Sequence, residues 1–512
     1  MHRRDFLKVL PAAFLSRSLM PTPAFADVPR GKKGDFGINL AGADYYTTEM
    51  PFANLATLAS RWRLQKADQP FTWDLPLPPM TDDGYPSSVP EGSYIETFLL
   101  FTRFRNSLPP ELFVTYEGEG KLEYSGGAKL VKRSPGVDQI RWLSTSDEPV
   151  TAQLVATNPS NPLRNLSLRE VPGKASGQTF RQAFLDRNGS MSTVRFMDWM
   201  QTNNSKVEEF EQRPPKRRFT QAENGVALEY MVELANRLQT APWFTLPHKA
   251  TDDYVSRFAE MVRTSLDPTL PVYVEYSNEV WNGQFDQSEY AQAQGLRLGL
   301  SSDPYVAQLR FYSQRTSEVL KIWERVFADE KDRVVGVYAT QADNEFSGET
   351  VLGWGDAMKY ADVHAIAPYF GRQFGDPDTA GKVSKWSLDR LFDELGKEVD
   401  GSNKKMMESQ AALAKRFGLK MMAYEGGQHL GGYNGAENDD RLTMLLVKAN
   451  WDPRMGDLYR RYLANWKSAG GGTFVLYNSM GGYGKWGSWG LLENEDKQTS
   501  PKWEAVQSMM KV

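Results

Sequence analysis

The feature that most constrains the fold is a series of eight short, almost continuously apolar segments, most of which alternate with stretches of helical apolar spacing. Strands buried on both faces have this apolar character, and they occur in parallel sheets covered by helices. Eight such strands favour a closed (β/α)8 barrel. The predicted strands lie within residues 34–42, 192–200, 241–248, the first half of 272–285, 332–340, 361–370, 419–427 and 471–478.

A different sequence pattern interrupts this alternation of strands and helices early in the chain. Residues 70–173 consist of short runs with period-two alternation, separated by Gly, Pro, Ser and Asp. This pattern is typical of an antiparallel β-sandwich. We therefore predict that residues 27–69 form the first βα unit, with a helix over 52–62, that a sandwich over 70–173 is inserted between barrel strands one and two, and that 174–512 complete the barrel.

The N-terminal segment resembles an export signal. It carries the twin arginines Arg3 and Arg4, a short apolar stretch, and the small-x-small sequence Ala24-Phe25-Ala26. These features predict a twin-arginine-type signal peptide over residues 1–26 and a periplasmic or secreted mature protein. The chain has no cysteine, so in an oxidising compartment its stability must come from the core and not from disulfides.

Charge and hydropathy narrow the range of partners. The formal net charge is only −4, which gives no electrostatic attraction to nucleic acid. No segment approaches the roughly 20 apolar residues that a membrane span needs, so no membrane insertion is predicted. Composition does not predict the oligomeric state.

Polar side chains collect where the predicted strands end. In a (β/α)8 barrel the carboxyl ends of the strands carry the reactive groups, whereas the strand bodies only pack. Two glutamates, Glu279 and Glu425, end two different strands, and paired carboxyl groups are what acid/base glycoside hydrolysis requires. The other polar residues at these ends are Arg195, Asp198, His248, Asn278, His364 and Tyr369.

Two of these ends carry recognisable motifs, YSNEVWN around Glu279 and AYEGG around Glu425. With them the barrel region resembles the clan A glycoside hydrolases, whose acid/base follows an asparagine after strand four and whose nucleophile follows strand seven. The resemblance implies Glu279 as acid/base and Glu425 as nucleophile. It also implies a supporting tyrosine, matched by Tyr369, and aromatic residues after strand eight on which a sugar ring stacks, matched by Trp486 and Trp489. It identifies no family within the clan.

The mechanism requires one glutamate to be neutral and the other ionised. Glu279, beside Val280 and Trp281, is expected in the more apolar setting and would keep its proton. Glu425 is expected to stay anionic by accepting hydrogen bonds from Tyr369 and Arg195. Asn278 would bind the sugar 2-hydroxyl. The complete set of predicted substrate contacts is Asn278, Arg195, His248, His364, Tyr369, Trp281, Trp486 and Trp489.

Several alternatives remain at this point. His248 and His364 can be structural residues, and Trp281 can belong to the core. A non-catalytic carbohydrate-binding protein is possible, as is a metal-dependent hydrolase with His248, His364 and His429 plus Asp198 or Glu425 as ligands. The sequence lacks His-x-His and HExxH spacings, so no metal and no cofactor is predicted. The predicted partner is a β-linked polysaccharide or oligosaccharide, with β-glucan as the first expectation; endo or exo action is not predicted.

Overall fold

The structure, a computed structural model, describes residues 34–101, 107–143, 148–171 and 178–510. The predicted signal peptide at 1–26 and the predicted end of the sandwich at 173 lie outside the described residues.

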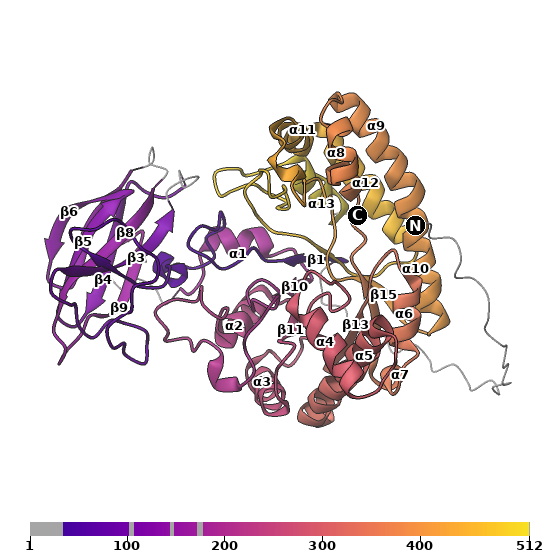
Figure 1. Cartoon of the computed structure of the whole chain (residues 1–512), viewed down its shortest axis with the longest axis horizontal. Helices are drawn as coiled ribbons and strands as arrows, with labels where there is room; N and C mark the ends of the chain where they lie inside the picture. Colours follow the sequence, from indigo (N-terminus) through magenta and orange to yellow (C-terminus); the bar gives the residue numbers. More distant parts are fainter. Residues whose placement is uncertain (1–33, 102–106, 144–147, 172–177, 511–512) are drawn as a thin grey trace.

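Eight parallel strands close into a barrel, which confirms the predicted (β/α)8 fold (Figure 1). Each observed strand lies inside a predicted one, and the last strand pairs with the first to close the sheet. Around the barrel the strands are β1 (Phe36–Asn39), β10 (Thr193–Arg195), β11 (Ala241–Leu246), β12 (Val272–Tyr276), β13 (Val334–Ala339), β14 (Val363–Ile366), β15 (Lys420–Ala423) and β16 (Phe474–Leu476).

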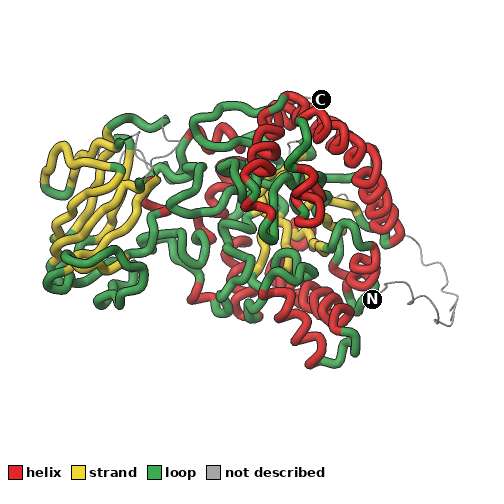
Figure 2. The backbone as a smooth tube through the Cα atoms, turned by 45° about the horizontal axis from the view of Figure 1, so that its top comes forward, coloured by secondary structure: helices red, strands yellow, loops and turns green. Residues whose placement is uncertain are grey.

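Helices surround this barrel (Figure 2). The helix over Asp252–Ser265 is favoured by its own N-terminus, because Thr251 accepts a hydrogen bond from the Tyr254 amide as N-cap and two aspartates follow in the first turn. The α-helices are α1 (Gln182–Asn188), α2 (Leu228–Leu238), α3 (Asp252–Ser265), α4 (Asp286–Arg297), α5 (Pro304–Phe327), α6 (Glu345–Leu352), α7 (Ala357–Tyr360), α8 (Pro377–Val383), α9 (Leu388–Glu398), α10 (Lys404–Arg416), α11 (Asp440–Trp451), α12 (Pro453–Ser468) and α13 (Pro501–Met510). Short helical turns are η1 (Leu55–Leu58), η3 (Phe210–Gln212), η4 (Ala328–Arg333), η5 (Arg372–Gly375), η6 (Val399–Asn403) and η7 (Ala436–Asn438).

Two four-stranded antiparallel sheets form between β1 and β10 in the sequence and lie beside the barrel in Figure 1. Apolar side chains from both sheets share one core, so the unit is a sandwich. One sheet has the order β2-β3-β8-β5 and the other β6-β7-β4-β9. Their strands are β2 (Arg63–Lys66), β3 (Ser93–Phe101), β4 (Glu111–Glu117), β5 (Gly120–Gly126), β6 (Ala128–Ser134), β7 (Val137–Trp142), β8 (Pro149–Thr157) and β9 (Arg164–Arg169).

The helix predicted over 52–62 does not form, and the sandwich begins before residue 70. Only the four-residue turn η1 is helical here, and β2 already starts at Arg63. Leu55 and Trp62 pack into the sandwich core, whereas Phe52 and Leu58 pack into the barrel core. Packing of this stretch into two tertiary cores therefore overrides its local helical spacing, and the helix of this first crossover is α1, after the insert.

No helix in the described ranges combines the length and the apolar character needed to cross a membrane.

Candidate active site

A cavity of about 1070 Å³ lies at the carboxyl ends of the barrel strands. Its walls come from the segments that follow β10, β12, β13, β14, β15 and β16, which is where a (β/α)8 barrel carries its reactive groups. Glu279 and Glu425 both line it. The fold therefore brings together in one cavity two carboxyl groups that are 146 positions apart in the sequence.

The chain turns sharply where it delivers Asn278 and Glu279. Consecutive side chains of a strand point to opposite faces, so a regular strand would present only one of these two residues to the cavity. After β12 ends, Ser277 has φ 61° and Glu279 has φ 42°, in the left-handed region that non-glycine residues rarely adopt. These two backbone turns place both Asn278 and Glu279 on the cavity wall. Each of the two left-handed backbone conformations is expected to cost on the order of 1–3 kcal/mol of folding free energy.

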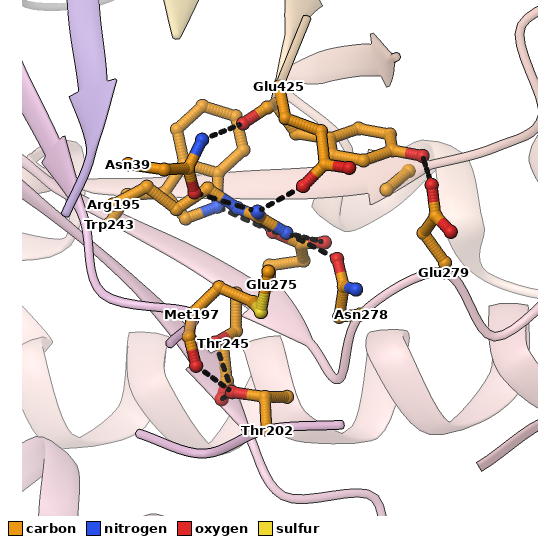
Figure 3. A network of polar contacts seen from close by, with 12 residues as sticks. Asn39, Arg195, Met197, Thr202, Trp243, Thr245, Glu275, Asn278, Glu279 and Glu425 are labelled. Carbon is orange, nitrogen blue, oxygen red and sulfur yellow. Dashed lines mark hydrogen bonds and ion pairs between the residues drawn. The ribbon is translucent and has the colours of Figure 1, made fainter. Parts of the chain in front are cut away.

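Arg195, the last residue of β10, organises the floor of the site (Figure 3). Its side chain is completely buried and does not line the cavity. All five of its N–H groups have acceptors: both Glu275 oxygens at 2.9 and 3.0 Å, Asn39 at 3.0 Å, Glu425 at 3.2 Å and Asn278 at 2.8 Å. One guanidinium thus ties together the ends of β1, β10, β12 and β15.

Glu275 balances the charge of Arg195. It accepts two hydrogen bonds from Arg195 and one from Trp243 Nε1 at 2.7 Å. Burial alone would lower the pKa of Arg195, but the negative charges of Glu275 and Glu425 raise it above its ordinary value, so the guanidinium stays ionised. Trp243 itself is fully buried inside the barrel.

Glu425 is held by two donors. Arg195 Nη1 donates to its Oε2 at 3.2 Å, and the Tyr369 hydroxyl donates to its Oε1 at 3.2 Å. These are the two donors that the sequence predicts for this glutamate. Both contacts favour the ionised carboxylate.

Glu279 has a different set of partners. The Tyr424 hydroxyl donates to its Oε1 at 2.9 Å and the Asn282 side-chain amide donates to its Oε2 at 2.8 Å. It makes no ion pair with Arg195, whose charge is shared by Glu275 and Glu425. Tyr424 immediately precedes Glu425, so its side chain connects the strand of one glutamate to the other glutamate.

The two carboxyl groups cannot both be ionised at low cost. Burial and the charge of Glu279 raise the pKa of Glu425 to about 8, and burial raises the pKa of Glu279 as well. The pair therefore retains one proton at neutral pH. When Glu279 carries that proton, its charge no longer acts on Glu425, and the Arg195 guanidinium then favours ionised Glu425.

Aromatic side chains form one wall of the cavity. Trp489 lies edge-on to His429, with ring centroids 4.6 Å apart, and contacts Tyr369 and Tyr477 at 6.0 and 6.1 Å. Burial lowers the pKa of His429 to about 4, so this histidine is neutral at physiological pH. Trp281, two residues after Glu279, also lines the cavity.

The structure places five of the eight predicted substrate contacts at the cavity or directly beneath it. Asn278, Tyr369, Trp281 and Trp489 line it, and Arg195 lies below its floor. The side-chain oxygen of Asn278 accepts a hydrogen bond from Arg195, and its side-chain amide donates one to Asn203 at 3.0 Å. These two bonds fix the orientation of the Asn278 side chain.

The other three predicted contacts lie outside the cavity lining. His364 belongs to the body of β14 and bonds Gln410 of α10 at 2.9 Å, because its side chain faces the helix layer. His248 is buried against Tyr290 beyond the end of β11. Trp486 lies in the turn before Trp489 and is 72% exposed.

The sequence did not single out several residues that complete the site. Tyr424, Asn203 and Asn282 orient the predicted residues through the hydrogen bonds given above. Asn282 lies inside the YSNEVWN motif and was recognisable from it. Asp198, noted only as a polar strand end and a possible ligand, accepts a hydrogen bond from the Tyr477 hydroxyl at 3.4 Å, and burial raises its pKa to about 6.

Across the described part of the chain, no three His, Asp or Glu side chains are grouped so as to hold a metal ion. His248 and His364 do not line the cavity that His429 lines, so the ligand set of the metal-dependent alternative does not converge.

Removal of Arg195 should destabilise the fold strongly. Arg195→Met leaves Glu275 and Glu425 buried without their cation, and breaking a buried ion pair in this way costs about 3–5 kcal/mol. Without the cation, the folded-state pKa values of both carboxyl groups rise further above the unfolded values, so the loss should grow as the pH increases. Urea unfolding at pH 5 and pH 8 measures this. The exposed Lys397→Ala, which removes the Glu394 pair, should change the unfolding midpoint little.

Comparison with known proteins gives matches only among solved structures. No family model matches the chain, and no curated protein sequence does. The chain is similar to the GH51 arabinofuranosidase from Xanthomonas axonopodis pv. citri (11% identity, 66% of this chain and 67% of that one, TM-score 0.42). It is also similar to a GH5-4 broad specificity endoglucanase from Clostridium acetobutylicum (12% identity, 65% of this chain and 91% of that one, TM-score 0.38). A third similar structure is a modular endo-β-1,4-mannanase from Cellulomonas fimi (12% identity, 66% of this chain and 67% of that one, TM-score 0.35). At these identities and TM-scores, a function has to be argued from the site itself.

Proposed function

We propose that this protein is a retaining glycoside hydrolase that cleaves a neutral, β-linked polysaccharide or oligosaccharide, with β-glucan as the first candidate. The observation that carries the proposal is the pair of buried glutamates in one cavity. Glu425 is contacted by Arg195 and Tyr369, and Glu279 receives only neutral donors. One carboxylate and one carboxylic acid at neutral pH are the two reagents that glycosidic cleavage uses.

In the first step, ionised Glu425 attacks the anomeric carbon while Glu279 gives its proton to the departing glycosidic oxygen. The C–O bond of the substrate breaks and an ester bond between the sugar and Glu425 forms. In the second step, Glu279 takes a proton from water, the water oxygen attacks the same carbon, and Glu425 leaves as carboxylate. Two inversions give net retention of configuration.

The charges around the cavity support a neutral substrate. Its acidic lining residues are Glu279, Asp343, Asp376, Glu398 and Glu425, and Arg372 is the one lysine or arginine among the described residues that line it. A polyanionic glycan would meet this negative field at a cost. The aromatic wall of Trp489, Tyr369 and Tyr477 suits the apolar faces of sugar rings.

Digestion of a panel of polysaccharides tests the proposal. The protein is incubated with mixed-linkage β-glucan, hydroxyethyl cellulose, mannan and xylan, and the products are identified, with the Glu279→Ala/Glu425→Ala double variant as the control for contaminating enzymes. Proton NMR of freshly formed product should show the β anomer first. An α anomer would refute retention, and binding without turnover on every substrate would favour the non-catalytic alternative.

The activity should show a bell-shaped dependence on pH. The working form has one proton on the pair, and that proton is lost on the alkaline side, because burial raises the pKa of both Glu279 and Glu425 above their ordinary values. Glu279→Gln cannot lose this proton, so with an activated aryl glycoside its kcat/KM should keep the acidic limb and lose the alkaline one. An unchanged alkaline limb in this variant would show that another group carries the proton.

We also propose that the protein is exported through its twin-arginine-type signal and acts in the periplasm or outside the cell. The support is the sequence of residues 1–26 alone. Cell fractionation and N-terminal sequencing of the mature protein, expected to begin at Asp27, test this.

A further inference from the structure

An exposed aromatic surface lies on the first sheet of the sandwich. Phe71 and Trp73, in the segment after β2, are 47% and 51% exposed, and Tyr46, in the segment after β1, is 60% exposed. We call these three side chains the aromatic platform. Large apolar side chains that gather on the surface of a protein commonly mark a binding site.

Hydrogen bonds from a buried side chain hold the backbone that carries Phe71 and Trp73. Gln65 of β2, itself buried, donates to the Thr72 carbonyl at 2.7 Å and accepts from the Thr72 amide at 3.0 Å. Thr72 stands between Phe71 and Trp73, so these bonds fix the backbone that presents both rings. The ring centroids lie 4.9 Å apart in an edge-to-face arrangement.

A buried guanidinium supports the same rings. Arg63 Cζ lies 3.8 Å from the centroid of the Phe98 ring, 5.1 Å from that of Trp73 and 5.8 Å from that of Phe71. Arg63 is only 2% exposed, so the cation acts from inside the sandwich and holds the rings against β3. Phe71 and Trp73 are therefore preorganised and lose little conformational freedom on binding.

The aromatic platform is continuous with the barrel side of the molecule. Tyr45 contacts the Tyr46 ring at 5.2 Å and the Phe98 ring at 5.5 Å, and Phe98 contacts Phe71 and Trp73 at 6.4 and 6.2 Å. The Tyr45 carbonyl accepts from the Phe101 amide at 3.3 Å, which joins the segment after β1 to the end of β3. The rings thus form one connected group between the barrel and the sandwich.

The near end of this group lies close to the candidate active site. Tyr46 is seven residues after Asn39, whose side chain accepts from Arg195, so at most about 25 Å of chain separates them. Burial and the charge of Asp44 raise the pKa of the Tyr46 hydroxyl to about 12, and Asp198, which also acts on Glu425, contributes to that shift. Asp198 also accepts a hydrogen bond from Tyr477, which lines the cavity, so it is near both the cavity and the Tyr46 end of this group.

We infer that the aromatic platform is a second binding site for the polysaccharide substrate, which extends from the active-site cavity over the segment after β1 onto the sandwich. The inference rests on the proposed function, because it takes the ligand to be the same neutral β-linked glycan. Sugar rings present apolar C–H faces that stack on aromatic side chains. A polymer that occupies both places gains affinity from the second contact, whereas a short substrate that fills only the cavity does not.

The test compares a polymer with a short substrate. In Phe71→Ala/Trp73→Ala, the Kd and the KM for mixed-linkage β-glucan should rise about tenfold, which corresponds to the loss of about 1.4 kcal/mol of stacking. The kcat/KM for an aryl β-cellobioside should stay within about twofold of the wild-type value, because the cavity is unchanged. Trp73→Tyr, which keeps a ring, should retain most of the affinity for the polymer.

Val131→Ala on β6 of the opposite sheet is the matched control, since Val131 is also an exposed apolar residue of the sandwich. Thermal unfolding midpoints verify that each variant folds. Affinity electrophoresis in gels that contain β-glucan measures binding without turnover, so it reports on the platform even if no hydrolysis occurs.

The possible outcomes are distinct. Hydrolysis of the polymer with an unchanged KM in the double variant would overturn the inference and leave the proposed function standing. Lost retention in the β-glucan gel without any hydrolysis would support the platform and refute the proposed function. If sedimentation shows a wild-type dimer that Trp73→Ala disrupts while glycan binding persists, the platform binds a second copy of this chain and the inference is wrong.

Discussion

Glu425→Ala should nearly abolish turnover on every glycoside, with a loss on the order of 10⁴- to 10⁶-fold, the range seen when a catalytic nucleophile is removed. In the proposed mechanism Glu425 forms the bond to the sugar, so its absence removes the first chemical step for good and poor leaving groups alike. Steady-state kinetics on an activated aryl glycoside and on β-glucan measure the loss. Glu260→Ala, on the exposed surface of α3, serves as the control and should behave like the wild type.

Azide provides a positive signal for the same variant. The alanine leaves space beside the anomeric carbon where a small anion can attack, with Glu279 still present to protonate the leaving oxygen. The product should be an α-glycosyl azide, inverted with respect to the β-linked substrate, because only one displacement occurs. Full activity of Glu425→Ala, or a β-glycosyl azide from it, would remove Glu425 from the nucleophile role.

Glu279→Ala should show a strong dependence on the leaving group. For β-glucan the loss should be about 10²- to 10⁴-fold, the usual contribution of general acid assistance. An aryl glycoside with an acidic phenol needs little protonation, so its first step should keep much of the wild-type rate. Burst kinetics with a series of substituted phenols measure the contrast as a steeper dependence of rate on phenol pKa.

Azide distinguishes this variant from the first. The glycosyl ester on Glu425 still forms in Glu279→Ala, and azide then attacks it without needing a general base. Two displacements give a β-glycosyl azide, with the configuration of the substrate retained. Equal losses for all phenols, with no azide product, would contradict the assignment of Glu279 as acid/base.

The contacts of the pair explain why the two glutamates should differ. Arg195 donates to Glu425 and not to Glu279, although both carboxyl groups line the same cavity. Tyr424 reaches Glu279 from the residue next to Glu425, so the two carboxyl groups share a rigid hydrogen-bonded frame. The site is therefore asymmetric before any substrate binds.

The sequence by itself determined the barrel and predicted two glutamates that the fold brings into one cavity. Each of the eight observed strands lies within a predicted apolar segment, because burial on both faces of a strand leaves a local signature. The glutamates could be found for a similar reason. A polar residue at the end of such a segment must leave the core, and in a closed parallel barrel all of these ends meet at one face.

Only the tertiary structure decided which polar residues reach the cavity and how. His364 and His248 were predicted at strand ends like the site residues, yet His364 lies in the body of β14 and faces the helix layer, and His248 packs on Tyr290. The helical spacing of 52–62 gave way to packing in the barrel and sandwich cores. The five hydrogen bonds of Arg195 join residues up to 230 positions away, and the rings of the aromatic platform come from separate segments. Local periodicity reports how one segment is buried, whereas these contacts depend on which distant segments are brought together when the chain folds.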